Sequence, residues 1–168
     1  MDTIGFGGSC HWCTEAIFQS LKGVSLVEQG WIASFEPDDA FSEAVVVHFD
    51  AQVISLQTLI SIHLYTHSCT AIHSMRGKYR SAVYATSHGQ AEQAAAIIET
   101  LQAEFAAPVI TKVLSLVSFK LNTSNYLDYY YSNPNKPFCQ NIINPKLTIL
   151  LEKFAGNVDT QKISSPDL

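Results

Sequence analysis

Two cysteines, Cys10 and Cys13, lie three positions apart in the stretch GGSCHWCTEA, directly after a pair of glycines. We expect Cys10 in the first turn of a helix, where unpaired backbone N–H groups and the positive end of the helix dipole stabilise an anion. A thiolate there has a lowered pKa and is a nucleophile at neutral pH, and a protonated His11 beside it would strengthen the effect. Cys13 falls on the same face of the helix, within reach of a disulfide.

Three other interpretations of this pair stay open. A zinc-binding interaction module would draw further ligands from HLYTHSCTAIH, which has no second C-x-x-C and aims His63 and His67 along an apolar face of a helix. Two inert buried cysteines are the second, although the Gly-rich turn before the helix argues against them. A thiol–disulfide oxidoreductase is the third, but the cis-proline usual opposite a thioredoxin-type C-x-x-C has no candidate between Pro37 and Pro108.

Glu43 begins the β-branched stretch SEAVVVHF. Alternation along a strand places its side chain on the same face as those of Val45, Val47 and Phe49. A carboxyl group in apolar surroundings has a raised pKa, holds its proton near pH 7 and can act as a general acid. Strand ends are also often exposed, so the pattern equally allows an ordinary rim residue.

The elements that must position these residues follow the order β-α-β-β-α-β-α-β. Apolar alternation and β-branched runs predict strands at residues 3–8, 24–32, 43–50, 79–86 and 109–119. Helical periodicity predicts helices over residues 9–23, 55–65 and 87–108, with Ser9 and Ser87 as N-caps of the first and third. Mixed hairpin and crossover connections favour an α+β fold, a two-layer ferredoxin-like plait with a mixed sheet, over a doubly wound sheet.

The bulk properties indicate one globular domain. With 168 residues, 47% of them hydrophobic and 15% charged, we expect a single catalytic domain over 1–155 and a loose tail over 156–168. The C-terminal part from Asn122 on is expected to wrap the body as loops and short helices. A net charge of −5 without a basic run argues against nucleic-acid or membrane binding. Four cysteines without a visible export signal suggest reduced thiols and a cytoplasmic protein.

Four stretches of the chain together resemble the A-type peptide methionine sulfoxide reductases. GGSCHWCTEAIFQSLKGV resembles the family's G-C-F-W-[CG]-x-E-x-x-F-x-x-L-x-G-V, and SEAVVVHFD its H-A-E-x-V-x-V-x-[YF]-D. GKYRSAVY resembles G-T-Q-Y-R-S-A-I-[YF], and PFCQNIINPKL resembles Y-C-x-x-V-I-x-P-K. The resemblance spans nearly the whole chain. It implies that Cys10 is the nucleophile, Glu43 the catalytic acid, Tyr79 an active-site tyrosine and Cys139 a resolving cysteine.

Several positions depart from the family pattern. His11 stands where the family has Phe, and Ser74 where an aspartate helps to bind substrate. The family segment before Glu43 is shortened to SFEPDDAFS, and its second active-site tyrosine has no counterpart. The resemblance is therefore to a divergent subgroup.

The resemblance also implies a mechanism. The Cys10 thiolate attacks the sulfur of a methionine S-sulfoxide, free or in a protein, and Glu43 protonates the developing oxyanion with the help of Tyr79. Trp12 and His11 would form the substrate-binding wall around the S-methyl group. No metal and no bound cofactor are implied.

The same resemblance implies how the enzyme is recycled. Cys10 is left as a sulfenic acid, which a second thiol converts to a disulfide that a thioredoxin-type donor reduces. We expect Cys13 to resolve first and Cys139 to act as a relay, while Cys69 matches no family position and is expected to be a buried spectator.

Overall fold

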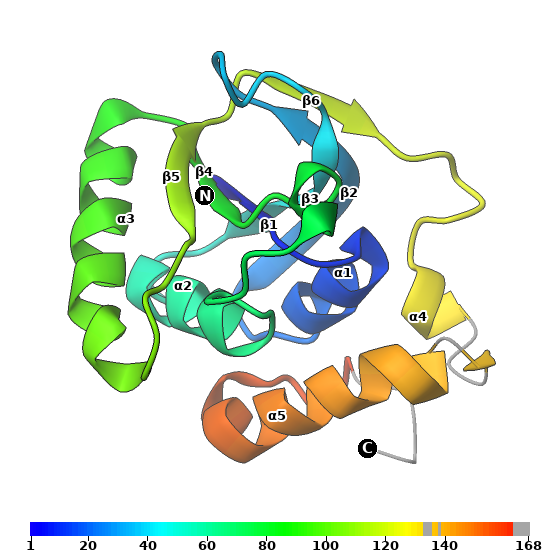
Figure 1. Cartoon of the computed structure of the whole chain (residues 1–168). Coiled ribbons are helices and arrows are strands. Elements are labelled where there is room, and N and C mark those ends of the chain that lie inside the picture. Colours follow the sequence, from blue (N-terminus) through cyan, green and yellow to red (C-terminus); the bar gives the residue numbers. More distant parts are fainter. Residues whose placement is uncertain (133–135, 138, 163–168) are drawn as a thin grey trace.

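One mixed sheet organises the molecule. The computed structural model describes residues 1–132, 136–137 and 139–162 (Figure 1). The sheet has the order β5-β4-β1-β3-β2-β6, in which β4 and β5 are parallel and the other pairs antiparallel. Its strands are β1 (Asp2–Gly7), β2 (Val24–Ala33), β3 (Ser42–Phe49), β4 (Ala82–Ala85), β5 (Lys112–Ser115) and β6 (Ser118–Leu121). The order β4-β1-β3-β2 within it is that of a ferredoxin-like plait, so the predicted α+β class is confirmed.

The helices cover one face of this sheet. They are α1 (His11–Gln19), α2 (Leu56–Tyr65), α3 (His88–Leu101), α4 (Tyr129–Ser132) and α5 (Asn144–Phe154), with a π-helical turn at Cys139–Ile143 and 3-10 turns at Ser74–Gly77, Gln102–Glu104 and Ala155–Asn157. Phe6 of β1 stacks on Phe18 of α1 with ring centroids 4.6 Å apart, in a core that also takes in Val45 and Val47. In Figure 1, α5 runs beside α1 and α2 and contacts both.

The predicted strand over 109–119 is wrong, because this segment forms two strands on opposite edges of the sheet. Ser115 and Ser118 are three residues apart and so lie at most about 11 Å from each other, whereas the edges of a flat six-stranded sheet are about 24 Å apart. The sheet must therefore curl. The Leu116 N–H donates to Ala85 O of β4 and the Val117 N–H to Ala33 O of β2, which ties the two sides together.

A second, smaller core fills the inside of this curl. It is made of buried side chains that point away from the helices: Ile32, Ala44, Val46, Ala82 and Tyr84, with Leu114, Leu116 and Phe119 against them. Gly30 permits the closeness of β6, since a Cβ atom there would lie 1.9 Å from the Lys120 carbonyl oxygen. The segment that follows α3 thus closes the face of the sheet opposite the helices.

The predicted helix boundaries were partly wrong. Ser87 is the N-cap of α3 as predicted, and its hydroxyl accepts from the Gln90 N–H. Ser9 does not cap α1: Cys10 occupies the N-cap position, no side chain caps this end, and the Ser9 hydroxyl contacts that of Thr14 at 3.2 Å. Both α1 and α3 end earlier than predicted, at Gln19 and Leu101, and α3 is followed by a 3-10 turn before the expected Pro.

The C-terminal part wraps the body as predicted, although α5, with 11 residues, is more than a short helix. Within the expected tail, Val158 is buried and forms an isolated bridge with Leu21, and Lys162 Nζ donates to Leu21 O and Val24 O. Residues 163–168 lie outside the described residues, and for them the tail stays a prediction. Each helix among the described residues is too short or too polar to traverse a bilayer.

Candidate active site

The turn between β1 and α1 sets the position of Cys10. The chain leaves β1 through Gly8, whose φ of +146° suits glycine and whose Cβ position is occupied by the ring of His67 at 2.5 Å. Cys10 follows as the N-cap residue of α1, and its carbonyl oxygen accepts from the N–H groups of Cys13 and Thr14. Its side chain is half-buried, so the thiol is placed at the helix start predicted for it and keeps access to solvent.

The thiols of Cys10 and Cys13 hydrogen-bond to each other, and this contact shifts their pKa values in opposite directions. A hydrogen bond from the Cys13 thiol is the largest cause that lowers the pKa of Cys10; burial opposes it, and the backbone N–H groups of Trp12 and Cys13 add to the lowering. The same contact, together with burial, raises the pKa of the Cys13 thiol. The proton therefore stays on Cys13 while Cys10 becomes the thiolate. The helix start contributes as expected, but less than the neighbouring thiol.

Glu43 lies at the start of the same helix. Its side chain is 6% exposed, and Oε1 accepts from the backbone N–H of His11 at 3.2 Å. Oε1 is also 3.5 Å from His11 Nε2, and Oε2 is 3.5 Å from Lys78 Nζ. The carboxyl group is thus buried on the helix side of β3, as the alternation allowed, but its nearest partners are polar. Strand β3 and helix α1 bring Glu43 and Cys10 close enough for the charge of Glu43 to act on the Cys10 thiol and raise its pKa.

The ring of His11 is turned into the protein. Nδ1 is 3.0 Å from the carbonyl oxygen of Gly30, and the ring is 5% exposed. Because a carbonyl only accepts, Nδ1 carries the hydrogen and Nε2 is left to face Glu43. Burial is the largest cause that lowers the pKa of His11, so the ring is neutral at pH 7 and adds no positive charge to Cys10. A part in the substrate wall stays a prediction.

Two tyrosines cover Trp12. The ring of Tyr129 stacks on the indole with centroids 4.1 Å apart, and that of Tyr126 lies at 5.7 Å. Trp12 itself is half-buried. The Tyr-rich run after Asn122 thus reaches the site.

Tyr79 and Glu43 are linked through Lys78. The pKa of Lys78 is raised, first by hydrogen bonding with the Tyr79 side chain and then by the charge of Glu43. The ammonium lies 5.1 Å from the centre of the Tyr79 ring. No local pattern in GKYRSAVY indicated that the Lys78 side chain would reach Glu43.

The remaining cysteines are buried. Cys139 lies in the π-helical turn before α5, and its charge and that of Lys146 act on Cys13. Cys10, Cys13 and Cys69 are free thiols. Burial raises the pKa of Cys69, which packs in the main core as a spectator would.

The histidines considered as zinc ligands are engaged elsewhere. The rings of His63 and His67 stack at 4.1 Å, and His67 Nε2 is 2.8 Å from the Ser81 hydroxyl. Burial lowers the pKa of both, to about 3 for His67. Within the described ranges, three or more His, Cys, Asp or Glu side chains do not converge on a common point that could hold a metal ion.

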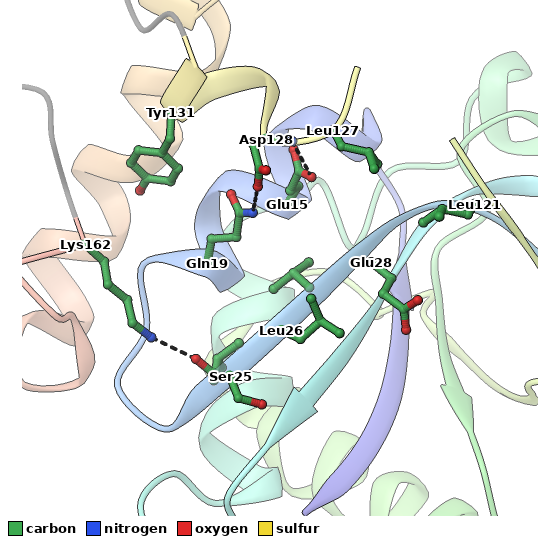
Figure 2. A pocket seen from close by; sticks show the side chains of 12 residues that line it. Glu15, Gln19, Ser25, Leu26, Glu28, Leu121, Leu127, Asp128, Tyr131 and Lys162 are labelled. Carbon is green, nitrogen blue, oxygen red and sulfur yellow. Dashed lines mark hydrogen bonds between the residues drawn. The ribbon is translucent and has the colours of Figure 1, made fainter. Parts of the chain in front are cut away.

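Glu15 holds in place the segment after β6 that covers Trp12. Figure 2 shows it beside Gln19 and Asp128, at a cavity of about 750 Å³ between α1, β2 and the segment after β6. Its carboxyl oxygens accept from the side chain of Gln29 at 2.9 Å and from the N–H groups of Asp128 and Tyr129 at 3.0 and 3.1 Å. Burial raises its pKa to about 7. Sequence reasoning did not single out Glu15, although it lies within the quoted cysteine motif.

Comparisons with known proteins agree on one family. The model of the family described as peptide methionine sulfoxide reductase matches residues 2–158. The peptide methionine sulfoxide reductase MsrA of Deinococcus radiodurans is 32% identical over 169 residues, which cover 91% of this chain and 82% of that protein. Reduced Mxr1 from Saccharomyces cerevisiae superimposes with a TM-score of 0.74 at 21% identity, over 82% of this chain and 88% of that chain. Mxr1 in complex with Trx2 gives 0.60 at 19% identity, over 76% and 84%.

Proposed function

The chain belongs to the peptide methionine sulfoxide reductase family, and from this premise we propose that Cys10 is its nucleophile and Glu43 its acid. Reduction of methionine sulfoxide, the activity of the family, is the activity of this chain. The observation that carries the two assignments is the meeting of a thiol of lowered pKa with a buried carboxyl group at one helix start. We assign the activity to a single catalytic domain over 1–155.

The first step transfers oxygen from the substrate to Cys10. The thiolate attacks the sulfoxide sulfur of a methionine S-sulfoxide, and protonated Glu43 gives its proton to the oxygen, with Tyr79 beside it. The bond between Cys10 and the methionine sulfur that forms in this attack and the bond between oxygen and that sulfur then both break, and the oxygen ends on Cys10 as a sulfenic acid. Methionine sulfur is reduced by two electrons while Cys10 is oxidised by two. Trp12 and His11 would wall the S-methyl group.

The second step forms a disulfide. The Cys13 thiol already hydrogen-bonds to Cys10, so it attacks the sulfenic sulfur with little movement and water leaves. Cys139, whose charge acts on Cys13, would relay the disulfide onward. A thioredoxin-type dithiol then supplies two electrons, in line with the fold shared with Mxr1 in its Trx2 complex. We assign this chemistry to the cytoplasm, where cysteines are kept reduced.

The test is a stereospecific assay with a thioredoxin system. Cys10→Ser should abolish reduction of methionine S-sulfoxide, free and in a peptide, while the R epimer is untouched by any form of the protein. Cys69→Ala is the matched control, because Cys69 is also buried but lies outside the site, and it should keep full activity. Unchanged turnover by Cys10→Ser would refute the nucleophile, and rapid insulin reduction without sulfoxide reduction would favour a general thiol–disulfide oxidoreductase.

A further inference from the structure

The ring of His11 is fixed in one tautomer that exposes a lone pair to Glu43. Nδ1–H donates to Gly30 O at 3.0 Å, and this carbonyl belongs to a central strand and cannot turn away. In a neutral imidazole the other nitrogen is then an acceptor. Nε2 lies 3.5 Å from Glu43 Oε1, the oxygen that also accepts from the His11 backbone N–H.

Asn122 is a second neighbour of His11 Nε2. Its amide nitrogen donates to Gln29 Oε1 at 2.7 Å and lies 3.5 Å from His11 Nε2. At 3.5 Å the contact from the Asn122 amide is a long hydrogen bond, so it satisfies the lone pair of Nε2 only weakly. Two buried acceptors, Nε2 and Oε1, face each other at a distance that one proton between them would make favourable.

We propose that His11 is a positioning residue that holds the catalytic proton on the Glu43–His11 pair, with the Glu43 carboxyl group donating to His11 Nε2. This rests on the proposed role of Glu43 as the acid. The family motif has Phe at this position, which offers no such acceptor. The pair acts as one site that binds one proton, whichever of the two atoms carries it.

The proton balance of the first step follows from this arrangement. The proton on the pair passes from Glu43 to the sulfoxide oxygen and remains there in the sulfenic acid. Glu43 is left as a carboxylate beside neutral His11, and the pair regains one proton from water before the next substrate. Lys78, which is exposed and lies 3.5 Å from Glu43 Oε2, borders the solvent side of the pair.

The charged and titratable groups around His11 come from several elements. Glu43 from β3 raises the pKa of His11 and Lys78 lowers it, while burial has the largest effect and lowers it. Cys10 is the N-cap residue of the helix that carries His11. The rings of Trp31 from β2 and His11 pack edge to face, with ring centroids 5.1 Å apart. Of these, only Glu43 can share a proton with Nε2, so removal of the imidazole should alter the protonation of Glu43.

The experiment measures the single-turnover rate of sulfenic acid formation as a function of pH. In His11→Phe, which restores the family residue, the fall in rate on the alkaline side should move to lower pH, because the variant lacks the acceptor Nε2 that helps to keep the proton on the pair. In His11→Ala, added imidazole should raise the rate several-fold, and it should have no such effect on wild type or on Glu43→Gln.

The outcomes separate this inference from the proposed function. An unchanged alkaline side in His11→Phe, or no response of His11→Ala to imidazole, would overturn the role of His11 as long as Glu43→Gln is slow. A wild-type rate in Glu43→Gln would instead refute the acid itself. Thermal unfolding of each variant checks that the fold is kept, since a packing role alone would lower stability without moving the pH profile.

Discussion

Two buried glutamates lie at the same short helix and have different roles. Glu15 is part of α1, and Glu43 accepts a hydrogen bond from the first residue of α1. Glu15 is 1% exposed and Glu43 is 6% exposed, so burial hardly distinguishes them. The three partners of Glu15 are amide N–H groups, two of them from the backbone. The partners of Glu43 include an imidazole and an ammonium group, which can gain or lose protons.

The difference shows that partners, more than burial, decide what a carboxyl group does. Amide donors keep their hydrogens at every pH, so the contacts of Glu15 can only hold Asp128 and Tyr129 in place. Glu43 lies beside the Cys10 thiol, whose pKa is lowered, and beside the His11 ring nitrogen, which accepts hydrogen bonds. Its neighbours can therefore take part in proton transfer. The first carboxyl group holds a segment against the protein, and the second is positioned to give a proton away.

The largest effect is expected when an amide replaces the carboxyl group of Glu43. Glu43→Gln should slow sulfenic acid formation by about 100-fold, because it removes the proton donor while it keeps the shape of the side chain. Disulfide reduction by thioredoxin should be unaffected. Glu15→Gln, the matched control, should leave the first step within a few-fold of wild type; equal losses in both variants would erase the contrast.

The second largest effect is expected on the stability of the protein when Glu15 is replaced. Glu15→Ala leaves the N–H groups of Asp128 and Tyr129 buried without their acceptor, and we expect the free energy of unfolding to fall by about 3 kcal/mol. Urea denaturation measures this change. Glu92→Ala removes an exposed carboxylate that pairs with the exposed His88 of α3, so it should change stability little. Similar values for the two variants would show that Glu15 anchors nothing.

The pH dependence of stability sharpens the same point. The pKa of Glu15 is raised from its ordinary value of 4.5 to about 7 by burial, so the folded protein binds a proton there that the unfolded chain has lost. Its contribution to stability is therefore full below about pH 4.5 and declines as the pH rises to about 7. Subtracting the curve of Glu15→Gln from that of wild type should reveal this slope, and parallel curves would contradict it.

The smallest effect is expected at Lys78. Its ammonium is exposed and reaches Glu43 only at 3.5 Å, so water screens the interaction. Lys78→Gln should lower the rate of the first step by at most about fivefold. A loss as large as that of Glu43→Gln would mean that Lys78 contributes to the chemistry directly.

The sequence predicted the parts of the site that depend on local patterns. Alternation placed Glu43 on the helix side of β3, and the Gly-rich turn placed Cys10 at the start of α1. Glu15 did not stand out in the sequence, because its contacts with Asp128 and Tyr129 span more than a hundred residues. Local pattern carries no information on such a contact.

The same limit explains the error in the fold. Residues 109–119 read as one strand because Leu116 and Val117, where it breaks, are apolar residues without a turn signal. The break depends on the carbonyl groups of Ala85 and Ala33, which come together only when the sheet curls. Strands β1 to β3, whose apolar alternation is local, were placed within one or two residues.

The curl of the sheet bears on the behaviour of the protein at high concentration. Both outer strands have four residues each and are joined by a two-residue link, so neither presents a long row of unpaired backbone groups. Short edges of this kind are poor templates for strand addition by a second molecule. The curl therefore protects the protein against edge-to-edge association with further copies of itself.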